Sequence, residues 1–139
     1  MTTALCQLLK LQYPLIQAPM AGVATPQLAA AVSNAGALGS ISVGAVTPQQ
    51  AAEMIAHTQA LTRGPINVHV FCHAPARRDA ARHAAWIRRF SPQFAPYQTA
   101  LPPALTEIYQ SLLHNHAMLT ALDQARPAAV RFPFGLPEL

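Results

Sequence analysis

The stretch Pro14–Gly44, PLIQAPMAGVATPQLAAAVSNAGALGSISVG, decides the fold. Its opening apolar run predicts a buried strand near residues 14–20. The Thr-Pro pair at 25–26 predicts the start of a helix, because threonine caps a free N–H and proline suits the first helical position. Gly36 is suited to the left-handed residue that ends such a helix, and a second apolar run follows at 38–43. A strand, a helix and a strand in so short a span predict a βαβ unit, whose strands must be parallel.

A second Thr-Pro pair at 47–48 repeats this pattern and predicts a helix over 48–62. A third strand is predicted at 66–72 and a fourth at 128–134. With the first two, these strands are expected to form a parallel four-strand sheet in chain order.

The third predicted strand alternates in polarity. Ile66, Val68, Val70 and Cys72 share one face, which we expect to lie under helices. The other face carries Asn67, His69, Phe71 and His73. This face should point into a barrel interior, which favours a ligand-facing role for Asn67.

The alternation of predicted strands and helices is interrupted between residues 74 and 103. Residues 75–90 are expected to be helical, with Trp86, Ile87 and Phe90 packed and the arginines outward. Four prolines predict irregular structure over 91–103. An active-site lid and a merely structural insertion are both open interpretations. Residues 104–124 are predicted to form one broken helix or two successive helices.

Composition limits the class of protein. The 139 residues suit one domain, whereas a complete TIM barrel needs about 250. Because 52% of the residues are hydrophobic and 10% charged, the chain is not disordered. No apolar run reaches the roughly 18 residues of a membrane span, and no signal peptide is recognised. Two cysteines are too few for a disulfide framework, so we expect a cytoplasmic location.

The net charge of +4 comes from arginines, six of which lie from Arg63 to Arg89. They share a predicted helix with Asp79 and many alanines, without the interleaved aromatic residues of a nucleic-acid site. A solvated helix face is therefore the expected role, and neither nucleic acid nor membrane is an expected partner.

Two segments carry a family resemblance. QAPMAGVATPQLAAAVSNAGALGS (17–40) and PINVHVFCH (65–73) resemble signature segments of the nitronate monooxygenases, once called 2-nitropropane dioxygenases, which are FMN-dependent TIM barrels. The resemblance covers nearly the whole chain but only the first half of the enzyme. It implies an α/β chain with the first four strands of a TIM barrel. Residues 1–139 are then one partial-barrel domain, with a helical, Pro-rich insertion at about 74–103.

The resemblance also implies FMN as the cofactor, lying across the carboxyl ends of the strands. Matched position by position, the segment against the flavin is Ala18, Pro19, Met20, Ala21 and Gly22. Small residues and bare backbone can approach a flat ring closely. Asn67 matches the family's third-strand asparagine, which contacts the cofactor. Taken outside this block, Met20 is better explained by core packing.

The chain departs from the family in two places. The family's fourth strand reads close to SFHFG, whereas residues 131–135 read RFPFG, with Pro133 in place of the histidine. A later block resembling EAGGHRG, with the catalytic histidine and part of the flavin phosphate site, is absent. We therefore expect no catalytic residue within these residues, and an inactive, truncated fragment that self-associates through its unpaired strand edges.

No metal site is expected. His69, Cys72 and His73 lie close in sequence, but a strand sends Cys72 to the face opposite the histidines. None of the usual zinc or iron spacings is present.

The expected parent reaction converts an alkyl nitronate and O2 to a carbonyl compound and nitrite. One alternative is a fragment of an FMN-dependent enoyl-acyl carrier protein reductase, which shares a similar first block. The other is a non-catalytic remnant that serves binding or assembly.

Overall fold

The computed structural model describes residues 3–137, which form two compact units. The first contains the residues up to Ala74 and those from Tyr109 onward, and the second is Pro75–Ile108.

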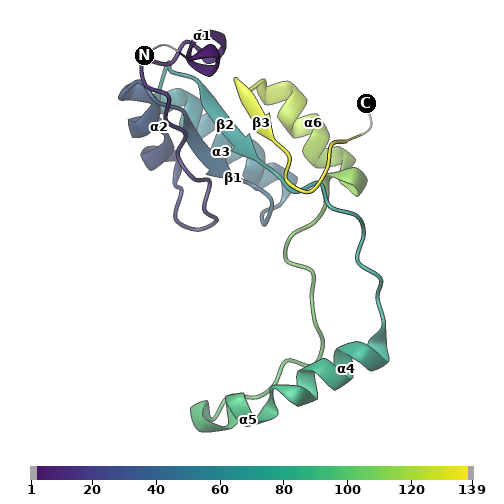
Figure 1. Ribbon diagram of the computed structural model, residues 1–139. Helices are drawn as coiled ribbons and strands as arrows, with labels where there is room; N and C mark the ends of the chain where they lie inside the picture. The colour runs from purple at the N-terminus through teal and green to yellow at the C-terminus, as the bar shows by residue number, and fades with distance from the viewer. Residues whose placement is uncertain (1–2, 138–139) are drawn as a thin grey trace. The chain divides into compact units, whose positions relative to one another are not determined.

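The first unit contains a parallel sheet of three strands (Figure 1). The strands are β1 (Gly39–Ser42), β2 (Ile66–His69) and β3 (Ala129–Arg131), in the order β1-β2-β3. Both pairings are parallel, so the predicted direction and order are confirmed for these three strands. Each strand is shorter than predicted.

The predicted first strand at 14–20 is wrong as a regular strand. Only Ile16 pairs, as an isolated parallel bridge to Leu38. Pro14 and Pro19 have no N–H to donate to a ladder. The next donor on β1, the Ser40 N–H, is bound by the side chain of Gln17 instead of by backbone.

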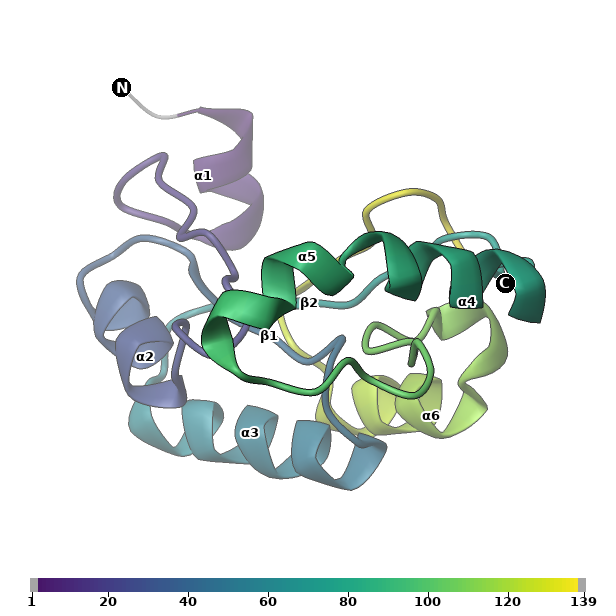
Figure 2. The ribbon, with the colours of Figure 1, turned by 90° about the horizontal axis from the view of Figure 1, so that it is seen from below.

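Three helices lie side by side on one face of the sheet, with α3 between the other two (Figure 2). They are α2 (Pro26–Asn34), α3 (Pro48–Leu61) and α6 (His116–Ala125), the last preceded by the short 3-10 turn η2 (Leu112–His114). The predicted helices after both Thr-Pro pairs are thus confirmed. A further helix, α1 (Ala4–Leu9), precedes them without having been predicted.

Both predicted threonine caps are present. The Thr25 hydroxyl accepts the N–H of Leu28 at 3.2 Å, and the Thr47 hydroxyl accepts that of Gln50 at 3.2 Å. The Gln50 side-chain oxygen in turn accepts the Thr47 N–H at 3.0 Å, which completes a capping box. These caps fix where each helix leaves the sheet.

The core lies between the sheet and the helices. Ile41, Val43, Ile55 and Val68 are among its fully buried members. Each aliphatic side chain so buried contributes about 1.5–3 kcal/mol. The aliphatic face of β2 therefore lies under the helices, as predicted.

The second unit contains α4 (Ala80–Arg89), α5 (Ser91–Phe94) and the 3-10 turn η1 (Ala95–Tyr97). The predicted helix over 75–90 begins only at Ala80, because Asp79 acts as its cap and accepts the Arg82 N–H at 3.0 Å. The expected packing of Trp86, Ile87 and Phe90 is wrong, since none of the described α4 residues is buried. Trp86 instead contacts the Phe90 ring at 5.0 Å and the Arg89 guanidinium at 5.7 Å.

Two other predictions need correction. Residues 91–97 are helical rather than irregular, because Pro92 and Pro96 occupy opening positions of α5 and η1, where a missing N–H costs nothing. The helix predicted from residue 104 begins only at Leu112.

Candidate functional site

The sheet face opposite the helices carries ordered layers of side chains, and we call it the inner face. Register places Ser40 beside Asn67 and Ala129, and then Ser42 beside His69 and Arg131. Val130, which lies between Ala129 and Arg131, packs on the helix-side core. Alternation therefore turns Arg131 to the inner face. Two successive layers of this face are thus largely polar.

Asn67 belongs to a buried hydrogen-bond chain in the first layer. Its Nδ2 donates to the Ser40 hydroxyl at 3.1 Å, and the Ser40 N–H donates to Gln17 Oε1 at 3.1 Å. Ser40 is fully buried, and Asn67 is 4% exposed. Gln17 Nε2 is also buried but has no hydrogen-bond partner among the described residues. A buried donor without a partner is costly, so this atom marks a place where a ligand acceptor fits.

His69 is the central residue of the second layer. It is 8% exposed, and its buried Nδ1 has no hydrogen-bond partner within the described part of the chain. Burial, and then the positive charge of Arg131, lower the pKa of His69 below its usual 6.5. The imidazole is therefore neutral at neutral pH, with one nitrogen available to a ligand.

An aromatic cluster covers the carboxyl end of β2. Phe71 contacts the rings of His69 and Tyr109 at 5.0 and 4.9 Å, and Phe134 stacks on it at 6.0 Å. A Cβ on Gly44, two residues after the end of β1, would lie 2.6 Å from the Phe71 ring, so a larger residue there would have to displace that ring. Phe134 remains 78% exposed, which leaves an apolar rim beside the polar layers.

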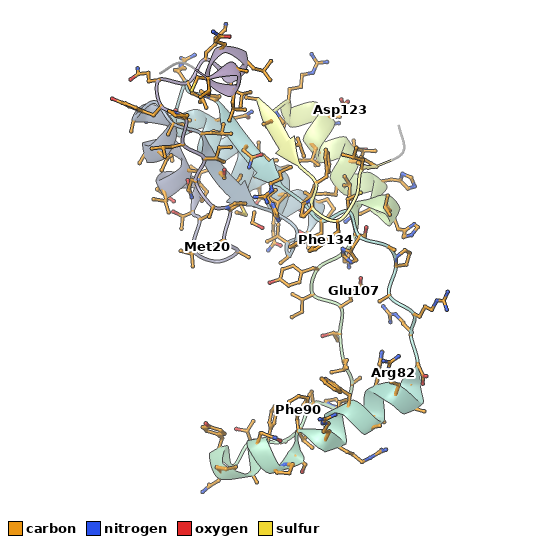
Figure 3. All side chains as sticks on the ribbon, in the orientation of Figure 1. Met20, Arg82, Phe90, Glu107, Asp123 and Phe134 are labelled. Carbon is orange, nitrogen blue, oxygen red and sulfur yellow. The ribbon has the colours of Figure 1, made fainter. Side chains whose placement is uncertain are left out.

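The loop after Gln17 lies at the same end of the sheet. Figure 3 places Met20 and Phe134 on the side toward which the strands run. The Met20 carbonyl accepts the N–H groups of Val23 and Ala24 at 3.1 and 2.8 Å, which holds the loop in a tight turn. Because Met20 is 54% exposed, core packing does not explain it.

The six residues predicted to bind the cofactor thus fall into two groups. Asn67 is buried on the inner face, whereas the other five lie in the loop, where most are exposed: Ala18, Pro19, Met20, Ala21 and Gly22. Gln17 connects the two groups. It directly precedes Ala18 in the chain, and it accepts the N–H of Ser40, whose hydroxyl accepts from Asn67.

Sequence reasoning missed Gln17, Ser40 and Arg131 as parts of this face. For Ser40 and Arg131, period-two alternation within the predicted strands was an available indication. For Gln17 there was none, because its segment is not a regular strand.

The residues present fit a flat ligand with hydrogen-bonding edges. A Cβ on Gly22, whose φ is +76°, would meet nothing within 4 Å, so the space beside the loop backbone is open. The partnerless atoms of Gln17 and His69 add two buried polar groups on the adjoining face. Among residues 3–137, no three His, Cys, Asp or Glu side chains are grouped to hold a metal ion.

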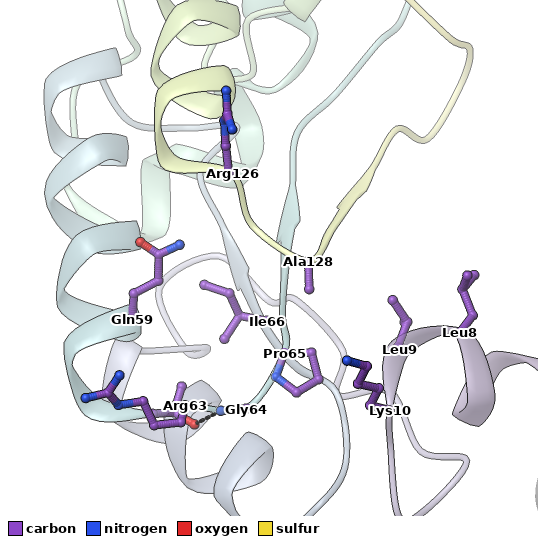
Figure 4. A pocket seen from close by; sticks show the side chains of 11 residues that line it. Leu8, Leu9, Lys10, Gln59, Arg63, Gly64, Pro65, Ile66, Arg126 and Ala128 are labelled. Carbon is purple, nitrogen blue, oxygen red and sulfur yellow. Dashed lines mark hydrogen bonds between the residues drawn. The ribbon is translucent and has the colours of Figure 1, made fainter.

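A pocket of about 740 Å³ lies at the other end of the sheet, where the strands begin (Figure 4). Its lining includes Pro65 and Ile66, where β2 begins, together with Lys10, Arg63 and Arg126. Ligands of parallel sheets bind outside the carboxyl ends of the strands. The inner face and the Met20 loop are therefore the better candidate site.

Within residues 3–137, no helix has the length and apolar character that crossing a membrane requires.

Comparison with known proteins identifies a matching family and related chains. The family model described as nitronate monooxygenase matches residues 2–138. A nitronate monooxygenase of Paraburkholderia phytofirmans is 50% identical over 134 residues, which cover 96% of this chain and 37% of that protein. One of Pseudomonas aeruginosa is 46% identical over 137 residues, with 99% and 39% covered. The chain thus spans well under half the length of these curated relatives.

Solved structures show the same similarity. The nitroalkane oxidase from Streptomyces ansochromogenes superposes with a TM-score of 0.78 at 33% identity, over 98% of this chain and 37% of that one. A FabK mutant from Thermotoga maritima has a TM-score of 0.61 at 22% identity, over 96% of this chain and 32% of that one. The latter likeness concerns the fold alone.

Proposed function

Because the chain belongs to the nitronate monooxygenase family, we propose that it forms the first half of an FMN-dependent TIM barrel that oxidises alkyl nitronates with O2. The products are a carbonyl compound and nitrite. The observation that carries this proposal is the family match over nearly the whole chain, combined with a polar inner face beside an open loop. The parallel strands β1–β3 and the Ile16–Leu38 bridge then correspond to the four strands of the half-barrel.

FMN would be held by the Met20 loop and by Asn67. Backbone groups of residues 18–22 would pack against the flat ring, because the loop is exposed and Gly22 leaves space beside it. Asn67 offers its side-chain oxygen, since its Nδ2 is bound to Ser40. When bound, the flavin supplies the electron acceptor for the nitronate and the reductant for O2.

The remaining residues of the face orient and shield these groups. Ser40 and Gln17 fix the Asn67 amide, so the amide need not reorganise when a ligand arrives. The Phe71 ring, in contact with the rings of His69 and Tyr109, covers part of the carboxyl end of β2. No described residue of the chain is assigned as the catalytic base, because the family's histidine for that role belongs to the EAGGHRG-like block that these residues lack.

We further propose a cytoplasmic protein, with an insertion at about residues 74–103 after the third barrel strand, a segment that overlaps the compact unit Pro75–Ile108. Small-molecule nitronate and O2 are its proposed reactants, and nucleic acid and membranes are not proposed as partners. An enoyl-acyl carrier protein reductase has weaker support, because the curated relatives compared above are nitronate monooxygenases at 46–50% identity.

A chimera tests this function. This chain replaces the matched segment of the Pseudomonas aeruginosa relative, and FMN content, oxygen uptake and nitrite release are measured with ethyl nitronate. The expected result is an FMN-loaded chimera that releases nitrite. A folded, FMN-loaded chimera without turnover would contradict the assignment. A 2-enoyl thioester with NADH is the control substrate, and its reduction would favour the reductase alternative.

A further inference from the structure

We propose that Arg131 and His69 together bind the anionic nitro group of the nitronate on the inner face of the sheet. This inference rests on the function proposed above and adds the residues that recognise the substrate. Neither residue belongs to the loop or to the asparagine proposed to contact the flavin.

The sheet brings the two side chains together. His69 on β2 pairs in register with Arg131 on β3, and with Ser42 on β1. Paired residues of parallel strands project to the same face, and Val130 fixes that face by packing on the helix-side core. Arg131 and His69 are therefore lateral neighbours in one layer of the inner face.

His69 offers a buried donor that lacks a protein acceptor. With the proton on Nδ1, this atom needs an oxygen, and within residues 3–137 none is in hydrogen-bonding reach. A nitronate carries two oxygens that share one negative charge, so it supplies an acceptor in a region that water hardly enters. Ser42, which is 8% exposed, lines the other side of the same layer.

Arg131 supplies the charge. Its side chain is exposed, and within the described residues it makes no ion pair. Its charge acts on His69, since it contributes to the lowered pKa of that imidazole. A guanidinium binds paired oxygens through two parallel N–H bonds, which suits a nitro group.

The pairing predicts selectivity for the anion over the neutral nitroalkane. Both molecules have two oxygens, but only the nitronate has a full charge to pair with Arg131. Bringing an anion beside His69 also opposes the effect of Arg131 and raises the pKa of the imidazole. This gives a readout that is independent of turnover.

The experiment follows the His69 ring signals of the 139-residue chain by NMR during titration with ethyl nitronate, nitroethane or inorganic phosphate. Ethyl nitronate is expected to shift the His69 signals and raise the pKa of His69, whereas nitroethane and phosphate leave both unchanged. Arg131→Gln should weaken nitronate binding by about tenfold, the loss expected for a charged hydrogen bond. Arg131→Lys should retain part of the affinity, and Arg63→Gln at the opposite end of β2 should retain all of it.

Unchanged His69 signals, or an Arg131→Gln variant that folds normally and binds nitronate as before, would overturn the inference. An equal response to phosphate would also overturn it, because the site would then suit the cofactor's phosphate. FMN binding is measured on the same samples. FMN binding without a nitronate response contradicts this inference alone, whereas a nitronate response without FMN binding counts against the proposed function and leaves the anion site standing.

Discussion

The Gln17 side-chain oxygen accepts the backbone N–H of Ser40 at 3.1 Å, so a side chain occupies the place of a backbone strand partner. Only the bridge between Ile16 and Leu38 precedes it along this edge. The contact thus joins the Met20 loop to the buried Asn67 amide.

We predict that Gln17→Ala destabilises the fold. Ser40 is fully buried, and leaving its N–H without an acceptor costs about 1–3 kcal/mol. Urea unfolding measures this loss, and Gln27→Ala on the exposed side of α2 is the matched control. Equal stability of the two variants would show that the bond contributes nothing.

We predict a larger effect for Gly39→Ala than for Gly22→Ala. A Cβ at Gly39 would overlap the Ala29 carbonyl of α2, and the backbone there must move at a cost of about 1–3 kcal/mol or more. A Cβ at Gly22 meets nothing, so only the strain of its φ of +76°, about 1 kcal/mol, remains. Thermal unfolding of both variants gives the comparison, and the reverse order would contradict the packing of α2 on β1.

We predict that His69 makes stability depend on pH. Because burial and Arg131 lower its pKa in the folded state, the unfolded chain takes up a proton first as the pH falls. The free energy of unfolding should therefore decrease below the ordinary pKa of 6.5, and this loss should be smaller in His69→Gln. Urea unfolding above and below that pH tests this, with the exposed His57→Gln as control. Identical pH dependence in wild type and His69→Gln would refute it.

We predict that the 139-residue chain self-associates. One edge of β3 is unpaired among the described strands, and Leu15 and Ile16 are 63% and 51% exposed at the other side of the sheet. Such edges pair with other chains unless charges block them. Sedimentation should show concentration-dependent association that Leu15→Lys reduces and Gln27→Lys does not. A monomer at all concentrations would contradict this prediction.

The sequence predicted the parts of the fold that local chemistry controls. Both Thr-Pro helix starts, the parallel order of β1–β3 and the two faces of β2 follow from capping and alternation, and the structure confirms them. The first strand was predicted wrongly because its ladder depends on a side chain, Gln17, rather than on its own backbone. The periodicity of a sequence gives no information about a side chain that takes the place of a backbone hydrogen-bond partner.

The site was predictable to a similar degree. The inward direction of Asn67 and His69 followed from alternation, but the neighbourhood of His69 and Arg131 required the register between β2 and β3. That register joins residues 62 positions apart, and no local pattern specifies it. The burial expected for the apolar residues of α4 is not seen within its own unit, where none of the described α4 residues is buried.

The placement of FMN on the inner face is tested most directly by the affinity of the chain for FMN. This affinity is measured by quenching of flavin fluorescence in wild type, Asn67→Ala and Asn34→Ala. Asn34 lies at the end of α2, where its amide bonds the Leu61 carbonyl, so it controls for the loss of a structural asparagine. We expect one FMN per chain, with affinity lowered about fivefold by Asn67→Ala through the loss of roughly 1 kcal/mol, and unchanged by Asn34→Ala. No FMN binding, or equal affinity in wild type and Asn67→Ala, would contradict the placement of the flavin on this face.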